Sequence, residues 1–476
     1  MSFFFNTNNN INPIDNLIQL FRQSETGKLV KPIERQKGLI QTKNSTLSDL
    51  KLRLNTLYQA VKDLSLTGVA SKFQVKIAVV SNADVLSATA QSSATSANHT
   101  IFVQQLAKED TILSSSFSNS GFEILNSTGE GAKTINVTVN GISTDVNITI
   151  SSGDTNNVIL NKIASAINST VGDVSASVVN PTSSTARLVI KSKNTGSQYA
   201  ISMSDVYGNL LASIGLDSNT LSNRISSTDT NGGYLYSDVN LLDAQIIVDG
   251  INIIRGSNKI SDVISGVTIE LRKAQSPGDT SVSVTVQTDV SQVKGVIENF
   301  IKAYNDLMKF INEKTKTTAE GVRTTFSGDN MLMRLKMDLR LRVSSAVSSA
   351  NPSFLNDIGI KINPDGTLVV SDSSKLERMI AEDVSKVELL FNSSDGIAVK
   401  LKDLINPFVQ VGGVIDKRID LGKEQIKRLD ERIKSLNDLI DQRAENLRRQ
   451  FAQLQSLYFA FTRQQTLIQQ MTSILQ

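Results

Sequence analysis

Apolar residues recur at a spacing of seven near the start of the chain. The main line is Ile33, Ile40, Leu47, Leu54 and Val61, and a second line beside it is Leu50, Leu57 and Leu64. Two such lines at three-and-four spacing form one apolar face of a helix. We therefore expect a long helix here. A shorter apolar pattern precedes it, through Ile14, Leu17, Ile18 and Phe21.

The end of the chain carries the most regular pattern. One apolar residue in every seven forms an unbroken line, namely Ile419, Ile426, Ile433, Ile440, Leu447, Leu454, Phe461, Ile468 and Leu475. A period of seven sustained this long predicts a left-handed coiled coil or a long bundle helix. A continuous helix from Ile415 would be about 90 Å long, which exceeds the radius of an ordinary domain.

Between these ends, apolar and polar residues alternate with a period of two. The strands predicted in this way include IFVQQLAKED, INVTVNGISTDVNITI, AQIIVDGINII, GVTIELRKA and TSVSVTVQTDV. Asn140-Gly141 and Asp249-Gly250 lie between alternating runs, which is a strong hairpin signal. A helix-like run follows each hairpin, NVILNKIASAIN in one case and NKISDVISG in the other. We therefore expect two related modules, each a hairpin followed by a helix.

After about Ser291 the helical period returns, with one ambiguous segment. From Met333 to Val343 apolar and polar residues alternate strictly, which would form a strand with a basic face. Leu332, Leu335 and Leu339 also fit one helix face, and no turn residue interrupts the segment. The helical flanks favour a helix. Its basic face is interpreted as a solvated surface, because the aromatic residues of a nucleic-acid groove are missing.

The expected fold class is α+β and multidomain, with β-rich head domains inserted between long N- and C-terminal helices that form a helical leg and a coiled coil. The predicted divisions follow the changes in pattern. They are an N-terminal arm at 1–66, a β-rich head domain at 67–107 plus 241–290, a variable outer head domain at 108–240, a mainly helical leg at 291–414 and a C-terminal coiled-coil helix at 415–476.

Composition narrows the function classes. The 476 residues are 39% hydrophobic, enough for several cores, and the net charge of +3 gives no global field for nucleic acid or a membrane surface. The sequence contains no run of about eighteen apolar residues, which is the length that a membrane-spanning helix needs. The first residues do not resemble a cleaved secretory signal. The chain has no cysteine, which rules out disulfides and thiolate chemistry.

Nothing in the sequence predicts an enzyme. His99 is the only histidine, and with no partner residue near it in sequence we expect a surface or packing role. No pair of acidic residues stands out for glycan hydrolysis. We therefore expect no catalytic residue, no metal site and no cofactor.

Charge almost disappears from the last helix after Arg449. In the stretch from Phe451 to Gln476 only Arg463 is charged. Exposed apolar surface of this extent would promote association. The two terminal helices could simply pack together inside one monomer. Since the C-terminal line is longer than the N-terminal one, we favour contacts with other subunits or a filament through both lines: Ile33, Ile40, Leu47, Leu54, Val61, Ile419, Ile426, Ile433, Ile440, Leu447, Leu454, Phe461, Ile468 and Leu475.

Four stretches of the chain follow the pattern of one known family. They are INPIDNLIQLFRQSETGKLVKPIERQK, NADVLSATAQSSATSANHTIFVQQLAKED, AQIIVDGINIIRGSNKISDVISGVTIELRKAQSPGDTSVSVTVQTD and the C-terminal heptads. Through these stretches the sequence resembles the family of flagellar hook-associated protein 2, the cap of the bacterial flagellar filament. The similarity is weak from about Asp110 to Asn240, the variable outer domain of this family.

The resemblance implies a structural role. Members of this family leave the cell through the flagellar type III export channel, form a ring at the filament tip, and promote insertion and folding of exported flagellin. The implied partners are further copies of the chain, flagellin, hook-associated junction proteins and a flagellar export chaperone, and in some bacteria host mucin, to which the cap adheres. The implied location is extracellular, at the flagellum tip. The alternatives are a flagellin-like or other hook-associated filament subunit, or a free surface adhesin.

Overall fold

The computed structural model describes residues 13–317 and 324–474. Contacts within the chain divide it into two compact units. One unit comprises Met1–Phe73 and Val290–Gln476, and the other is Gln74–Asp289. The first unit is helical and is built from the two ends of the chain, whereas the second is rich in strands.

The N-terminal helices of the first unit follow one another without a loop. Helix α1 (Pro13–Glu25) continues through a π-helical segment, η1 (Thr26–Val30), into α2 (Lys31–Leu64). The shorter apolar pattern and the long one therefore lie on helices joined by a widened helical turn. Pro32 lies in the first turn of α2, directly after this π-helical segment.

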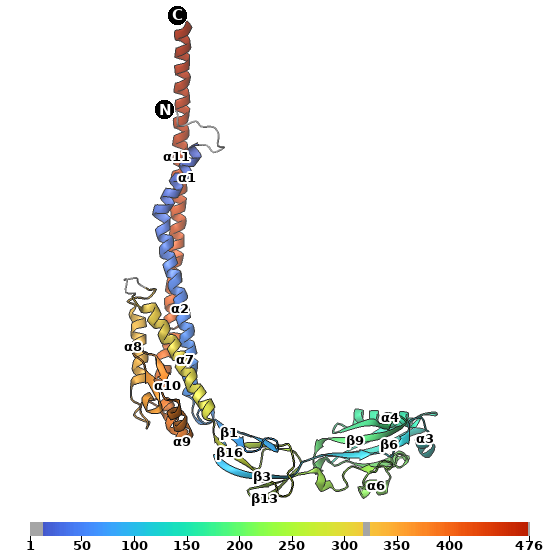
Figure 1. The fold of residues 1–476 in the computed structure, drawn as a ribbon. Helices are drawn as coiled ribbons and strands as arrows, with labels where there is room; N and C mark the ends of the chain where they lie inside the picture. The colour runs from blue at the N-terminus through green and yellow to red at the C-terminus, as the bar shows by residue number, and fades with distance from the viewer. Residues whose placement is uncertain (1–12, 318–323, 475–476) are drawn as a thin grey trace. The chain divides into compact units, whose positions relative to one another are not determined.

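Helix α11 (Val414–Ile474) is the longest element and confirms the continuous helix expected from the spacing of seven. It packs along α2, η1 and α1 (Figure 1). In Figure 1 it continues past the described end of α1. The apolar line that predicted the helix therefore has helical neighbours along its first part.

The rest of the first unit packs around α2 and forms its core. It contains η2 (Gly68–Ala70), α7 (Val290–Thr315), α8 (Asn330–Ser344), η5 (Leu355–Ile358), β17 (Ile360–Ile362), β18 (Leu368–Val370), α9 (Ser373–Asn392) and α10 (Ile397–Val409). The ambiguous segment 333–343 is helical, as favoured. Leu335 and Leu339 of α8 are buried in the core, whereas Met337 is exposed, a one-sided burial that a helix of this pattern allows.

The second unit contains two separate hydrophobic cores. Two sheets enclose the first core. One has the order β1-β16-β3-β12-β13 and the other β14-β15-β2. Their strands are β1 (Lys76–Val80), β2 (Leu86–Ala90), β3 (Ala97–Gln105), β12 (Ala244–Val248), β13 (Ile251–Arg255), β14 (Lys259–Ile260), β15 (Val267–Leu271) and β16 (Val282–Thr288). Alternate side chains of β12 and β15 are buried, which is the periodicity that predicted these strands.

The other core of this unit lies around helix α4 (Asn156–Thr170), which packs on β7, β8 and β9. One sheet has the order β10-β6-β7, and the other has β11-β4-β9-β5 with β8 paired to β9. The strands are β4 (Glu109–Leu113), β5 (Phe117–Ser118), β6 (Gly131–Val139), β7 (Ile142–Ile150), β8 (Val174–Thr182), β9 (Thr185–Thr195), β10 (Ser202–Tyr207) and β11 (Gly233–Tyr234). Short helices α3 (Glu123–Thr128), α5 (Leu210–Ser213), α6 (Ser218–Ser222), η3 (Ser197–Tyr199) and η4 (Val239–Leu242) complete it.

Both predicted hairpins are present, but only one is followed by a helix. Asn140-Gly141 joins β6 to β7 and Asp249-Gly250 joins β12 to β13, each with two residues of positive φ. The run NVILNKIASAIN forms α4. The prediction of a helix in NKISDVISG is wrong, because this segment forms β14 and bends. Asn258 exchanges hydrogen bonds with the backbone of Ala107, and Ile260 is buried in the core, so tertiary contacts override the local helical pattern.

The fold class is confirmed as α+β, with long helices at both ends and β-rich structure between them. The five-part domain division stays a prediction. Among the described helices, none is both long enough and apolar enough to cross a membrane.

Candidate assembly surface on the terminal helices

The N-terminal apolar line is divided by its surroundings. Leu47, Leu54 and Val61 are buried in the core of the first unit, where α2 packs on α7 and α10. Ile33 and Ile40 lie nearer the start of α2 and are half-buried. Three of the five residues are thus buried by contacts within the chain itself. Their predicted role in subunit contacts stays a prediction.

The C-terminal line changes from covered to exposed along α11. Ile440 is buried, and the half-buried members are Ile419, Ile426, Ile433 and Leu447. Further along, Leu454, Phe461 and Ile468 are exposed. Leu475 lies outside the described residues. The single line of the sequence therefore consists of a first part packed against the N-terminal helices and a second part that faces solvent.

Five ion pairs fix the antiparallel register of α11 on the N-terminal helices. From the start of α11 onward they are Asp416 with Lys51 (2.5 Å), Asp430 with Lys37 (2.5 Å), Asp441 with Arg22 (3.3 Å), Arg443 with Glu25 (3.4 Å) and Arg448 with Asp15 (2.9 Å). Each surface pair contributes at most about 1 kcal/mol. Their order along both helices selects one alignment, because a shift of a turn would separate all five pairs.

A close backbone approach supports the same alignment. Gly422 is buried in α11, and a Cβ atom placed there would lie 2.2 Å from Oδ1 of Asn44 on α2. Glycine therefore lets the two helices come close at this level. Neither Gly422 nor Asn44 belongs to an apolar line, so the heptad pattern did not mark them.

The ion pairs end where the exposed tail begins. We define the exposed tail as residues 450–471 of α11. Its most exposed large apolar side chains include Leu454 at 61%, Leu457 at 66% and Phe461 at 65%. Arg463 is the only charged residue in it. An apolar surface of this length with one charge favours association, since burying it removes apolar area from water.

One contact that the sequence did not reveal ties α11 to α8. The carboxylate of Asp329 caps the start of α8 by accepting hydrogen bonds from the N–H groups of Met331 and Leu332. It also forms an ion pair with Arg418 of α11. Burial tends to raise the pKa of Asp329, but the hydrogen bond from Arg418 and those from the backbone outweigh it, so the pKa is lowered. The cap signal before α8 could have been found from sequence, whereas the pairing with Arg418 could not.

His99 has a partner in the second unit that the sequence did not reveal. Its Nδ1 lies 2.7 Å from Oδ2 of Asp249. Thr100 donates its backbone N–H to the other oxygen of the same carboxylate at 2.7 Å. The pairing of β3 with β12 brings together residues that are 150 positions apart. These contacts lower the pKa of Asp249 and tie β3 to the Asp-Gly turn.

Within the described parts of the chain, no group of three or more His, Cys, Asp or Glu side chains is placed to hold a metal ion.

Comparison with known proteins decides the family. The model named Flagellar hook-associated protein 2 N-terminus matches residues 12–110, and the model named Flagellar hook-associated protein 2 C-terminus matches residues 242–460. The chain belongs to the flagellar hook-associated protein 2 family. The two models cover α2, the first core of the second unit and α11 as far as residue 460, whereas residues 111–241 fall between them.

Relatives match along nearly the whole chain. An A-type flagellar hook-associated protein 2 from Pseudomonas aeruginosa is 26% identical over 93% of this chain and 92% of its own length. The flagellar hook-associated protein 2 of Salmonella typhimurium is 25% identical over 94% and 93%. The solved D1-D2-D3 domains of the flagellar cap protein FliD from Escherichia coli align with a TM-score of 0.58, at 25% identity, over 79% of this chain and 99% of theirs.

Proposed function

We propose that this protein caps the distal tip of the bacterial flagellar filament. In this proposal several copies form a ring there and promote the insertion and folding of exported flagellin. The role is structural rather than enzymatic. The observation that carries it is the exposed tail of α11, in a chain whose family includes flagellar cap proteins.

The proposed mechanism follows from the two parts of α11. The first part is fixed to α1 and α2 by ion pairs and apolar contacts, so it positions the tail. The exposed tail then buries its apolar residues against neighbouring subunits or the filament, which provides the driving force for assembly. Before assembly the same surface would need cover, which fits an export chaperone. The hook-associated junction proteins are the proposed neighbours during early assembly, and type III export is the proposed route.

The adhesion role stays a prediction from the family resemblance. It would involve residues 108–240 and the glycans of host mucin. A glycan-binding screen on the whole protein and on a variant lacking this segment would test it. If the whole protein and the variant bind glycans equally well, the outer head domain is not the part that adheres.

The deciding experiment for the proposed function is electron microscopy of filaments grown with this protein carrying a visible label. The expected result is label at the distal ends only, because a closed ring cannot extend along the filament. Label along the whole filament would instead support a flagellin-like subunit. Absence of label from the filaments would support a free adhesin, and either result would overturn the cap proposal.

A further inference from the structure

We propose that the free edge of strand β7 binds an extended polypeptide segment of another protein. The observation behind this proposal is a long and regular edge strand beside an open groove. The strand lies in the part of the chain between the two family models, so the family assignment gives it no role. The proposal does not depend on the cap function.

The hairpin geometry shows which backbone groups of β7 face outward. Asn140 and Gly141 both have positive φ, so they form a two-residue turn whose flanking pair, Val139 and Ile142, is hydrogen-bonded. Hydrogen-bonded pairs then alternate along the strands, and the even-numbered residues of β7 bond to β6. The N–H and C=O groups of the odd-numbered residues, Ser143, Asp145, Asn147 and Thr149, therefore point away from the sheet.

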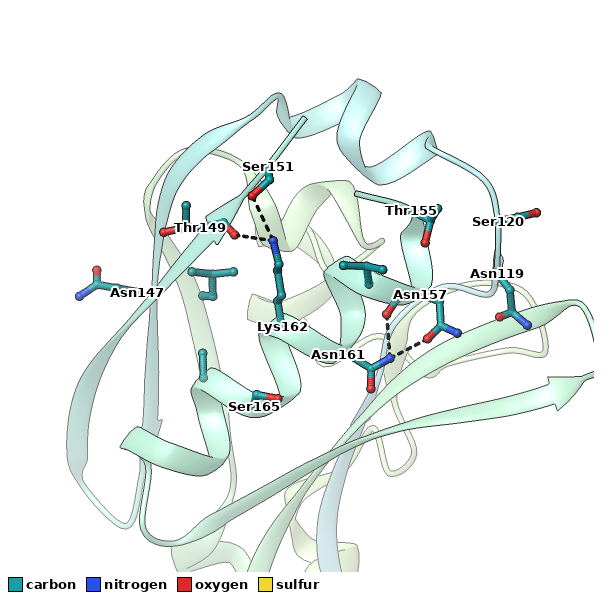
Figure 2. A pocket seen from close by; sticks show the side chains of 13 residues that line it. Asn119, Ser120, Asn147, Thr149, Ser151, Thr155, Asn157, Asn161, Lys162 and Ser165 are labelled. Carbon is teal, nitrogen blue, oxygen red and sulfur yellow. Dashed lines mark hydrogen bonds between the residues drawn. The ribbon is translucent and has the colours of Figure 1, made fainter. Parts of the chain in front are cut away.

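Side-chain contacts at one end of β7 agree with this parity. The carbonyl oxygen of Thr149 accepts a hydrogen bond from Nζ of Lys162 at 3.2 Å (Figure 2). The N–H of Ser151 donates to Asp154 at 2.7 Å. Lys162 also pairs with Asp154 at 2.6 Å. These groups close the end of the edge near Ser151. The outward groups of Ser143, Asp145 and Asn147 lie on the remaining length.

Apart from the charge of Asp145, the stretch of β7 from Ser143 to Asn147 lacks the features that normally protect an edge strand. Edge strands are commonly short, bulged, interrupted by proline or covered. β7 has nine residues, contains no proline, and pairs with β6 without a register shift. The opposite edge of the same sheet is different, because β10 has a bulge between Asp205 and Tyr207 and packs against α6. One edge of this sheet is thus obstructed, while the other is regular and open.

A groove runs beside this edge, between β7 and α4, and Figure 2 shows it from close by. Its volume is about 920 Å³. Val158 of α4 is 43% exposed and lies in the groove wall together with Ala166. A strand added to β7 would direct alternate side chains toward this wall, because side chains of a strand alternate between faces.

The hydrogen-bonding groups of the free edge indicate that the occupant is an extended polypeptide. A row of outward N–H and C=O groups, spaced by two residues, matches the backbone of a second strand, which is the basis of β-strand addition. The groove next to it accommodates the side chains of that strand. A glycan could bond to the Asn and Ser side chains that line the groove, but none of the lining residues is aromatic, and a glycan would not need the backbone row.

The test is hydrogen exchange on the full-length protein, with a synthetic peptide of alternating valine and threonine as the probe. The free protein should exchange the amides of Ser143, Asp145 and Asn147 rapidly and those of Thr144 and Val146 slowly. Addition of the peptide should slow exchange at the odd-numbered residues. An analogue methylated on alternate backbone nitrogens should bind about tenfold more weakly, since it loses hydrogen bonds while keeping its side chains.

Matched variants test the same edge from the protein side. Asn147→Pro removes an outward N–H and leaves the bonds between β7 and β6, whereas Asn147→Thr keeps the N–H. We expect about tenfold weaker peptide binding for the first and unchanged binding for the second. Val158→Asp changes the exposed groove wall and should also weaken binding. Unchanged circular dichroism would show that each variant folds.

Three outcomes would overturn the proposal. The first is equal binding of the methylated peptide. The second is slower hydrogen exchange of the odd-numbered amides when the protein is concentrated without peptide. That result would assign the edge to a second copy of the chain. The third is binding of a mucin oligosaccharide in the groove with no binding of the peptide, which would assign the groove to glycans.

Discussion

At the residue scale, Asp329 shows how one side chain can connect two elements. It caps α8 through two backbone N–H groups and holds Arg418 of α11. The residue is mostly buried, so its charge gains from the pairing more than an exposed carboxylate would. Its removal affects a helix start and a helix–helix contact together.

We predict that Asp329→Ala lowers the free energy of unfolding of the first unit by about 2 kcal/mol, because the α8 cap and the Arg418 contact are both lost. Asp329→Asn keeps the capping oxygen and should cost roughly half as much. Urea denaturation followed by circular dichroism measures both changes. If both variants lower the free energy of unfolding equally, or if neither lowers it, the capping contact does not contribute to stability.

Asp249 supplies a prediction about pH. His99 and Thr100 hold the pKa of its carboxylate below the usual value, so the ionised form is favoured in the folded protein. The stabilisation is complete above the unfolded pKa of about 3.9 and is lost as pH falls through the lower folded pKa. The carboxylate is largely exposed, so the effect should be at most about 1 kcal/mol.

Asp249→Asn should therefore be less stable than the natural protein at about pH 5, and the difference should shrink toward about pH 2. Asparagine suits the positive φ of this turn, so the hairpin itself should persist. Thermal unfolding over this pH range is the measurement. A stability difference that is independent of pH would assign the effect to the turn rather than to the charge.

At the element scale, α11 consists of a covered part and an exposed part that the sequence presents as one pattern. The same spacing of seven runs through both parts, but the ion pairs to α1 and α2 end at Arg448. The first part therefore has its cover within the chain, and the exposed tail does not have it among the described residues. Substitutions in the two parts should act on different properties.

We predict that Leu454→Ser combined with Phe461→Ser reduces self-association, measured by analytical ultracentrifugation over a range of concentrations. The free energy of unfolding of the isolated chain should change by no more than about 0.5 kcal/mol, since both side chains are exposed there. Leu421→Ser is the matched control, because Leu421 is similarly exposed on the first part of α11. A loss of association by the control alone would move the assembly surface away from the tail.

Two short segments show why some elements could be predicted and others could not. Segment 333–343 is helical because Leu332, Leu335 and Leu339 share a face that the core buries, and this spacing is visible in the sequence. NKISDVISG has a similar local pattern, yet Asn258 is held by the backbone of Ala107, a residue 151 positions earlier. Local periodicity therefore predicted an element only where the tertiary contacts agreed with it.

At the scale of the whole molecule, the two ends of the chain form one unit and the middle forms another. The two ends are joined by contacts between residues that lie far apart in the sequence. The ion pair of Lys51 with Asp416 is one such contact. The separate cores around α4 and around β3 lie within the middle of the chain. Variation in the middle can thus leave the helical unit intact, which agrees with family models that match on both sides of residues 111–241.

The sequence by itself determined the long terminal helices, both hairpins and the loss of charge along α11, because these features depend on residue types at short, regular spacing. Tertiary structure decided which members of each apolar line are buried. It placed Leu47 and Leu54 in the core and left Leu454 and Phe461 exposed, although all four belong to lines of the same period. The physical reason is that a period defines a helix face, whereas the partner of that face depends on long-range packing that no local pattern contains.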